Sequence, residues 1–308
     1  MSAARETTQP APLAPPHGAP AQAVALRHPA AGADHEPTTP DTLRNALAPR
    51  PRRPTWPWRL LLTPWLLVLL AWLGLISLVW NIVALPLLLL PRVLGQRVGR
   101  AGISLGYRFY WSCARASGLM RLDASALDVL RNEPGGLIIA ANHPSMLDAV
   151  MLVARLPRGV CVMKASLLRN PLLGAATRLA RYIPNDDPLT LIRASVSCLE
   201  DGGQLVLFPE GTRTLEPPIN PLLPGLGRIA LRARVPVQTV LIETDSPYLG
   251  KGWPLWRLPP LPIVFRARLG ARLCIESYTA TTGGPRDGPV AANALMADLD
   301  AYFRRELH

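Results

Sequence analysis

The chain has 308 residues, 49% of them hydrophobic, which is enough for one large domain or two modest ones. A formal net charge of +12 favours an anionic partner, such as a phospholipid surface, a nucleic acid or a phosphate-bearing substrate. The cysteines form no CxxC pair and have no metal-ligand spacing, which argues against a disulfide framework and fits a reducing compartment. They are Cys113, Cys161, Cys198 and Cys274.

Residues 1–54 are rich in Ala, Pro and Thr and show no apolar periodicity. Such a segment buries too little surface to order itself, so we expect a disordered tail. Its histidines are irregularly spaced, which favours a solvated tail over a metal site; they are His17, His28 and His35.

Residues 55–92 are predicted to be a membrane anchor. From residue 60 to 90 the chain is almost continuously apolar and carries no charge, and about 20 such residues suffice for one span. Arginines flank both ends, so the positive-inside rule leaves two topologies open. One is a single long span; the other, which we favour, is a re-entrant hairpin bent near Asn81 and Pro86. Tryptophans at the start fit an aromatic belt: Trp56, Trp58 and Trp65.

Residues 93–120 are expected to form a basic helical connector, and residues 121–308 a domain of alternating strands and helices. This alternation predicts an α/β fold with a mixed, partly parallel sheet flanked by helices. Strands are expected at 136–141, 160–163, 204–208, 237–242, 262–269 and 272–275. Helices are expected at 146–155, 171–180, 190–199, 227–233 and 290–305.

The first polar motif follows the expected strand at 136–141. It reads Asn-His-Pro-Ser-Met-Leu-Asp and begins at Asn142. Asp148 is spaced to fix the tautomer of His143 and leave its other ring nitrogen free as a base, which would activate a hydroxyl. Ser145 lacks the glycines of a nucleophile elbow. The alternative interpretation is an ordinary helix start with an acidic first turn.

The second motif, Phe-Pro-Glu-Gly-Thr-Arg at residues 208–213, follows the expected strand at 204–208. A glycine turn offers backbone donors, and an arginine matches phosphate bidentately. A surface turn with a local ion pair is the alternative. Its position after a buried strand, in a basic chain with an apolar anchor, favours an anion site.

These motifs resemble those of the PlsC-like glycerolipid acyltransferases, also called the lysophosphatidate acyltransferase family. The first matches the NHxxxxD box and the second the FPEGTR box. Lys164, the Asn-Pro-Leu-Leu-Gly run at 170–174 and Tyr-Ile-Pro at 182–184 resemble the intervening box, and Val-Pro-Val at 235–237 resembles the fourth. The resemblance covers roughly residues 120–245, in the family's order.

The resemblance implies an O-acyltransferase of phospholipid biosynthesis. It would move a fatty acyl group from acyl-CoA or acyl carrier protein to the hydroxyl of a lysolipid, foremost 1-acyl-sn-glycerol-3-phosphate. His143 and Asp148 would be catalytic, and the acceptor's polar head would contact Asn142, Lys164, Glu210, Gly211, Thr212 and Arg213. No cofactor or metal is expected because the thioester is already activated. We expect the inner membrane, with the catalytic domain facing the cytoplasm.

Three departures concern the acceptor side. Asn185, Asp186 and Asp187 stand where the family often has an arginine, which indicates either a solvated loop or a changed acceptor pocket. Pro224 replaces a lysine, and Thr239 replaces a proline.

The same chemistry on another acceptor, such as a lyso-ornithine lipid, therefore stays open. A catalytically degenerate membrane-binding protein is a further alternative. Nucleic-acid binding is disfavoured because the arginines are dispersed and lack a stacking aromatic motif.

Overall fold

A computed structural model describes residues 54–281 and 288–307. Within them, seven strands form one sheet in the order β1-β7-β6-β2-β5-β3-β4. Neighbouring strands run parallel except β6 and β7, which are antiparallel. This confirms the mixed, partly parallel sheet. The strands are β1 (Met120–Asp123), β2 (Leu137–Ala141), β3 (Gly159–Met163), β4 (Ile183–Pro184), β5 (Gln204–Leu207), β6 (Val237–Thr244) and β7 (Ile263–Leu273).

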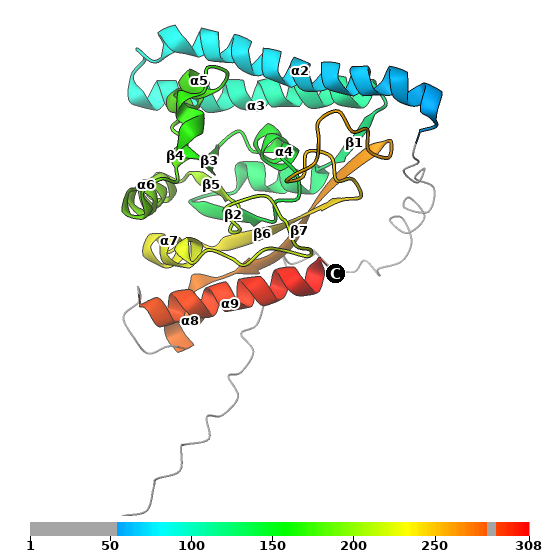
Figure 1. Ribbon diagram of the computed structural model, residues 1–308. Coiled ribbons are helices and arrows are strands. Elements are labelled where there is room, and N and C mark those ends of the chain that lie inside the picture. The colour runs from blue at the N-terminus through cyan, green and yellow to red at the C-terminus, as the bar shows by residue number, and fades with distance from the viewer. Residues whose placement is uncertain (1–53, 282–287, 308) are drawn as a thin grey trace, which may run out of the picture.

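Helices cover both faces of the sheet (Figure 1). On one face lie α2 (Trp56–Leu87), α3 (Arg92–Ala116), α4 (Leu147–Arg155) and α5 (Gly174–Ala180); on the other lie α6 (Pro188–Glu200), α7 (Gly225–Ala233), α8 (Ile275–Thr281) and α9 (Pro289–Glu306). Residues 54–281 also contain two 3-10 helices, η1 (Ser125–Asn132) and η2 (Ala165–Arg169). Alternate residues of β2 serve the two cores: Ile139 packs on the α3 side and Ile138 on the α7 side.

Several sequence-based boundaries need correction. The expected strands at 262–269 and 272–275 are one strand, β7, and Ile275 instead begins α8. Gly270 does not break β7. Its missing side chain leaves space for Tyr302 and Thr239, since an added Cβ would lie 2.4 Å from the Tyr302 hydroxyl and 2.5 Å from Thr239 Oγ1. The short strands β1 and β4 were not predicted. The expected tail lies outside the described residues, apart from residue 54.

The bend predicted near Asn81 and Pro86 lies slightly later in the chain. α2 runs unbroken through both residues, and the chain reverses only at residues 88–91 before returning as α3 alongside it (Figure 1). Asn81 instead bonds to α5: its Oδ1 accepts from the backbone N–H groups of Ala175 (2.7 Å) and Ala176 (3.1 Å). These are first-turn donors that a helix cannot satisfy internally. The polar break in the apolar run therefore fastens α2 to the domain.

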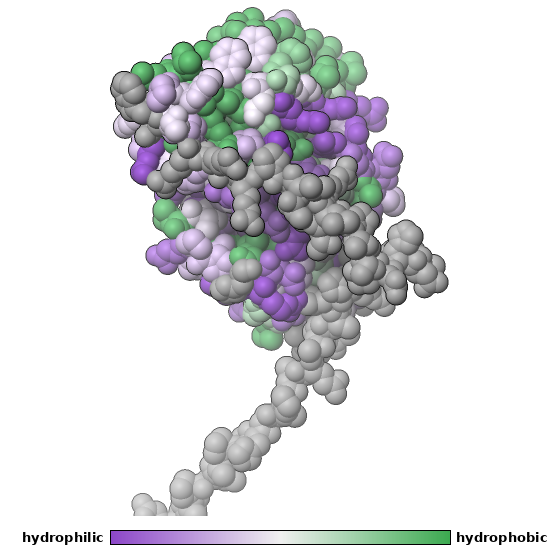
Figure 2. All heavy atoms as spheres, turned by 90° about the vertical axis from the view of Figure 1, so that its right-hand side faces the viewer, coloured by the Kyte–Doolittle hydropathy of each residue, from purple (hydrophilic) through white to green (hydrophobic). Residues whose placement is uncertain are grey.

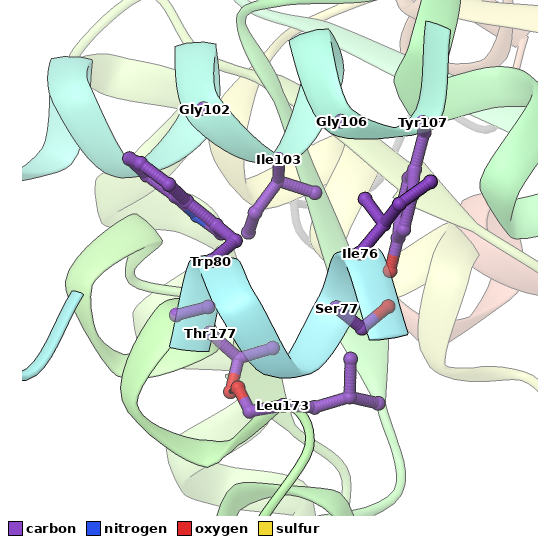
Figure 3. Close-up of a pocket in the computed structure, with 10 residues that line it drawn as sticks. Ile76, Ser77, Trp80, Gly102, Ile103, Gly106, Tyr107, Leu173 and Thr177 are labelled. Atoms are coloured by element: carbon purple, nitrogen blue, oxygen red, sulfur yellow. Dashed lines mark hydrogen bonds between the residues drawn. The ribbon is translucent and has the colours of Figure 1, made fainter. Parts of the chain in front are cut away.

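Close contact between α2 and α3 depends on glycines of α3 (Figure 3). The Trp80 ring lies over Gly102, where an added Cβ would be 1.9 Å from the ring, and a Cβ added at Gly106 would be 3.2 Å from Ile76. Between them lie a small cavity of about 20 Å³ and an open apolar groove of about 560 Å³ lined by Trp72, Val79 and Phe109. The two helices are therefore in close contact at the glycines and leave an open groove beside them.

Candidate active site

Both sequence motifs lie at one rim of the sheet. β2, β3, β5 and β6 are mutually parallel, so the loops that follow them leave the same edge. His143 follows β2, Lys164 follows β3, Glu210 follows β5, and residues 245–262 follow β6. The fold therefore brings together segments that are far apart in the sequence.

His143 and Asp148 form a hydrogen-bonded pair. Asp148 Oδ2 lies 2.9 Å from His143 Nδ1 and also accepts the backbone N–H of Ser145 at 2.7 Å. Two donors to one oxygen hold Asp148 in place, and its bond to Nδ1 favours the tautomer with the proton there. The Nε2 atom is then the acceptor, on a side chain that remains 17% exposed.

Asp148 is fully enclosed. Burial raises the pKa of its carboxyl above the ordinary value, while the bonds from His143 and Ser145 act in the opposite direction. Among the described residues, its second oxygen, Oδ1, has no hydrogen-bond partner. The carboxyl is therefore held next to the imidazole in a low-dielectric setting.

The rest of His143 is fixed by the second motif. The Phe208 ring stacks on the imidazole, with ring centroids 4.0 Å apart and planes 18° apart. Glu210 Oε1 accepts the backbone N–H of His143 at 2.8 Å, and the His143 carbonyl accepts the N–H of Thr214 at 2.8 Å. The ring and both backbone groups of His143 are thus held by residues from after β5.

Glu210 lies inside the protein. Only 4% of the residue is exposed, and its carboxylate accepts three hydrogen bonds. The donors are His143 N, Thr214 Oγ1 and Asn220 N, at 2.8, 2.8 and 2.9 Å. With both oxygens bonded inside the protein, Glu210 holds the backbone of His143, and its contact with an acceptor's polar head stays a prediction.

Asn142 is likewise engaged internally. Its amide donates to the Ile242 carbonyl at 2.8 Å and accepts the Ile242 N–H at 2.7 Å. Asn142 is buried and joins the end of β2 to β6, and its contact with a substrate stays a prediction. The sequence pattern indicated a polar group there but not its direction.

The remaining predicted ligands are more open. Gly211 and Lys164 are exposed, and Thr212 and Arg213 are partly exposed. Gly211 has φ +66°, a conformation that glycine adopts readily, and its N–H closes a turn onto the Phe208 carbonyl. Lys164 stands at the end of β3, two strands from β2. Their contact with an acceptor stays a prediction.

One guanidinium nitrogen of Arg213 is hydrogen-bonded within the protein. A terminal nitrogen donates to the carbonyls of Leu249 (2.7 Å) and Gly250 (3.2 Å), in the loop after β6. Leu249 has φ +57° and also accepts the Met146 N–H at 3.1 Å. Arg213 therefore ties the second motif to a loop that also holds the first.

Three contributors were not predicted from sequence. Ser145 is fully buried, and its hydroxyl donates to the Tyr248 carbonyl at 2.9 Å, which explains why it is no nucleophile. Asn220 bonds to Glu210 and to the Arg213 carbonyl, and Phe208 stacks on His143. A polar residue soon after a glycine turn was the only signal available for Asn220.

The departures have local structural reasons in two cases. Asp187 caps α6, since its side chain accepts from the N–H groups of Leu189 and Thr190. The bonds to Thr190 lower the pKa of Asp187 below its ordinary value. Thr239 is buried in β6, where its hydroxyl donates to the Ala271 carbonyl of β7 at 2.7 Å. Asp186 is exposed.

Comparison with known proteins supports one class. Residues 123–243 match the family model described as Acyltransferase. A 1-acyl-sn-glycerol-3-phosphate acyltransferase of Limnanthes douglasii is 29% identical over 136 residues, covering 42% of this chain and 48% of that protein. One from Cocos nucifera is 25% identical over 173 residues, covering 54% of each. The chain thus spans about half the length of the curated relatives it matches.

The fold agrees with this class. The crystal structure of PlsC from Thermotoga maritima, a 1-acyl-sn-glycerophosphate acyltransferase, superposes with a TM-score of 0.56 at 17% identity, covering 78% of this chain and 94% of that one. The α/β domain around His143 is therefore an acyltransferase domain. The chain is thus similar in sequence and in fold to the PlsC-like acyltransferases.

Proposed function

We propose that this protein transfers a fatty acyl group from a thioester to the hydroxyl of a lysolipid. The observation that carries the proposal is the hydrogen-bonded pair of His143 and Asp148 at the sheet rim, with the imidazole partly exposed. A buried carboxylate on Nδ1 leaves Nε2 as the base, which is the arrangement that activates a hydroxyl.

In the proposed reaction, His143 Nε2 takes the proton of the acceptor hydroxyl as its oxygen attacks the thioester carbonyl. Asp148 stabilises the resulting imidazolium. The tetrahedral intermediate collapses to an ester and a thiolate, and the thiolate recovers the proton from His143. No acyl-enzyme is formed, which agrees with the inward bond of Ser145. The step calls for no cofactor because the thioester is already activated.

We propose 1-acyl-sn-glycerol-3-phosphate as the first acceptor to test, since the relatives that match carry that name. Arg213 and Lys164 are the cations of this rim that would contact a phosphate. A second candidate, an aminolipid such as a lyso-ornithine lipid, is favoured by the exposed carboxylate of Asp186, where the family often has a cation. Acyl-CoA and acyl carrier protein are both candidate donors.

We also propose that α2 and α3 lie in one leaflet of the inner membrane, with the domain on the cytoplasmic side. α2 contains one apolar stretch long enough to cross a bilayer, Leu60–Leu87, with 17% of its most apolar window buried. Yet its buried residues run from Leu66 to Ala84, about 27 Å of helix against the domain. A perpendicular span would draw that domain face into the hydrocarbon.

The surface chemistry supports an in-plane pair. Hydrophobic residues gather over the helices at the top of Figure 2, and the hydrophilic surface lies below. α3 exposes Leu94, Leu105 and Phe109 to this apolar surface. At 3.6 residues per turn, three exposed arginines fall on one line beside that stripe, as expected of a helix at the head-group level: Arg97, Arg108 and Arg115.

The test is an acyl-transfer assay on membranes that contain the full chain. Each donor is offered with a panel of lysolipids, including 1-acyl-sn-glycerol-3-phosphate and a lyso-ornithine lipid, and membranes with His143→Ala are the control. Formation of an acylated product by the wild type alone supports the proposal. A lipidomic comparison of cells with and without the gene identifies the acceptor independently. No product with any pair of donor and acceptor would refute the activity.

A further inference from the structure

The loop between β6 and β7 has an exposed apolar and basic tip. Residues 251–257, called the tip here, read Lys-Gly-Trp-Pro-Leu-Trp-Arg. Trp256 is 74% exposed and Leu255 is 45% exposed, and both stand beyond the sheet rim that carries His143. Exposed tryptophan beside exposed leucine is unfavourable in water but suits the boundary between lipid head groups and acyl chains.

The conformation of the tip is fixed by internal contacts. Trp253 Nε1 donates to the Arg257 carbonyl at 3.0 Å, and the Arg257 guanidinium lies 4.6 Å from the centroid of the Trp253 ring. Arg257 N donates to the Pro254 carbonyl at 3.1 Å. These contacts close the tip into a tight turn that presents Leu255 and Trp256 outward at little conformational cost on binding.

The charge of the loop selects an anionic surface. The loop, residues 245–262, contains Lys251 and Arg257 and one carboxylate, Asp245, which adjoins β6 and lies outside the tip. Both cations are exposed and flank the apolar side chains of the tip. Cations beside interfacial aromatic residues match the phosphates of a bilayer, and each lysine or arginine near an anionic membrane strengthens binding about fivefold.

The loop lies on the same face of the sheet as the helix pair. Figure 1 draws it below the N-terminal half of α2, and Tyr248, Leu249 and Leu258 belong to the apolar core of that face, as do Leu66 and Leu69 of α2. The tip therefore extends the apolar surface of the helices toward the rim of the site.

We infer that residues 251–257 are a second membrane-contact element, which inserts Leu255 and Trp256 into the interface of an anionic bilayer. The root of the loop, residues 246–250, holds both motifs: Tyr248 accepts from Ser145, and Leu249 accepts from Arg213 and from Met146. Insertion of the tip thus holds the catalytic rim against the lipid surface. This deepens the proposed function and rests on it only for the activity measurement below.

The direct test is quenching of tryptophan fluorescence by bromine. The full chain is bound to vesicles of phosphatidylglycerol and phosphatidylcholine with brominated acyl chains, and Trp256→Phe is compared with the wild type. If Trp256 is in the interface, the wild type loses more total emission to the bromine than the variant does. An equal loss of emission in the two proteins would overturn the inference. Trp58→Phe, in α2, is the positive control. The measurement needs no turnover, so it stands even if the acyltransferase proposal fails.

The activity test separates lipid contact from a merely structural role. The variant is Leu255→Ser with Trp256→Ser, and its matched control is Val290→Ser in α9, which is 67% exposed on the opposite layer. We expect a several-fold loss with a long-chain lysolipid embedded in vesicles and no loss with a short-chain acceptor dissolved in water. Equal losses with both acceptors, or no loss with either, would contradict membrane contact by the tip.

Discussion

The two motifs of the site share a layout in sequence but differ in direction. The motif after β2 turns a reactive side chain, His143, toward the open rim, whereas the motif after β5 turns its carboxylate, Glu210, inward. Glu210 and Thr214 hold both backbone groups of His143, and Phe208 holds its ring. Much of the second motif is therefore support for the first.

The difference shows that the role of a carboxylate in such a motif depends on its hydrogen-bond partners and not on its residue type. Asp148 and Glu210 are both buried and both follow a strand of the same sheet. Asp148 bonds to a ring nitrogen, so it can influence proton transfer. Glu210 bonds to two backbone donors and a hydroxyl, so it influences geometry. The two predict different losses on substitution.

The largest effect is expected at the outward-facing residue. His143→Ala should lower acyl transfer by about 100- to 10,000-fold, the usual contribution of a positioned general base. Thermal unfolding is measured alongside, because the side chain is only 17% exposed and its removal leaves the buried Asp148 without its ring partner. The rate is measured with a saturating thioester donor. Full activity in this variant would remove the proposed mechanism.

Glu210→Gln should show whether Glu210 holds His143 in place or binds the acceptor directly. The amide keeps the shape but replaces an oxygen that accepts hydrogen bonds with an NH₂ group. We expect a loss of about 2 kcal/mol in the free energy of unfolding, as for hydrogen bonds to a charged group, together with a lower kcat. Glu216→Gln, exposed in the same segment, is the matched control. A raised KM for the acceptor with unchanged stability would instead restore Glu210 as a ligand.

Arg213→Lys tests whether the second motif also acts through the loop after β6. Lysine keeps the charge but loses the two-carbonyl contact with Leu249 and Gly250. We expect about a tenfold loss of activity and faster amide hydrogen exchange at residues 246–250. Arg228→Lys, exposed on α7, should change neither. A raised acceptor KM with unchanged exchange would mean that Arg213 acts as an anion ligand alone.

The sequence predicted the parts of this site that depend on short spacing. A histidine and an aspartate five residues apart, on either side of a helix start, meet through local geometry alone, and the apolar runs before each motif identified β2 and β5. The mixed sheet also followed from the alternation of elements. These features depend on periodicity and on contacts within one turn.

The features that were missed depend on distant partners. Nothing near Glu210 shows that His143 and Asn220 will occupy its oxygens, and nothing near Asn81 shows that α5 will receive its side chain. In an apolar run, an asparagine suggests a bend when no partner is visible. Its contact lies 94 residues further along the chain, so only the folded structure gives the reason.

The smallest effect expected is the pH dependence that Asp148 adds to stability. Because burial raises its pKa, the folded state holds a proton that the unfolded state releases, beginning near the ordinary value of 3.8. The stability that Asp148 contributes is therefore highest below pH 3.8. It falls as the pH rises from 3.8 to the raised pKa of the folded state and is constant above that pKa. To remove titration of the imidazole, His143→Gln is compared with His143→Gln plus Asp148→Asn by thermal unfolding in detergent. The first protein should lose stability relative to the second as pH rises above about 4. The opposite slope would mean that the hydrogen bond from Ser145 outweighs burial and that the carboxylate is stabilised in the fold.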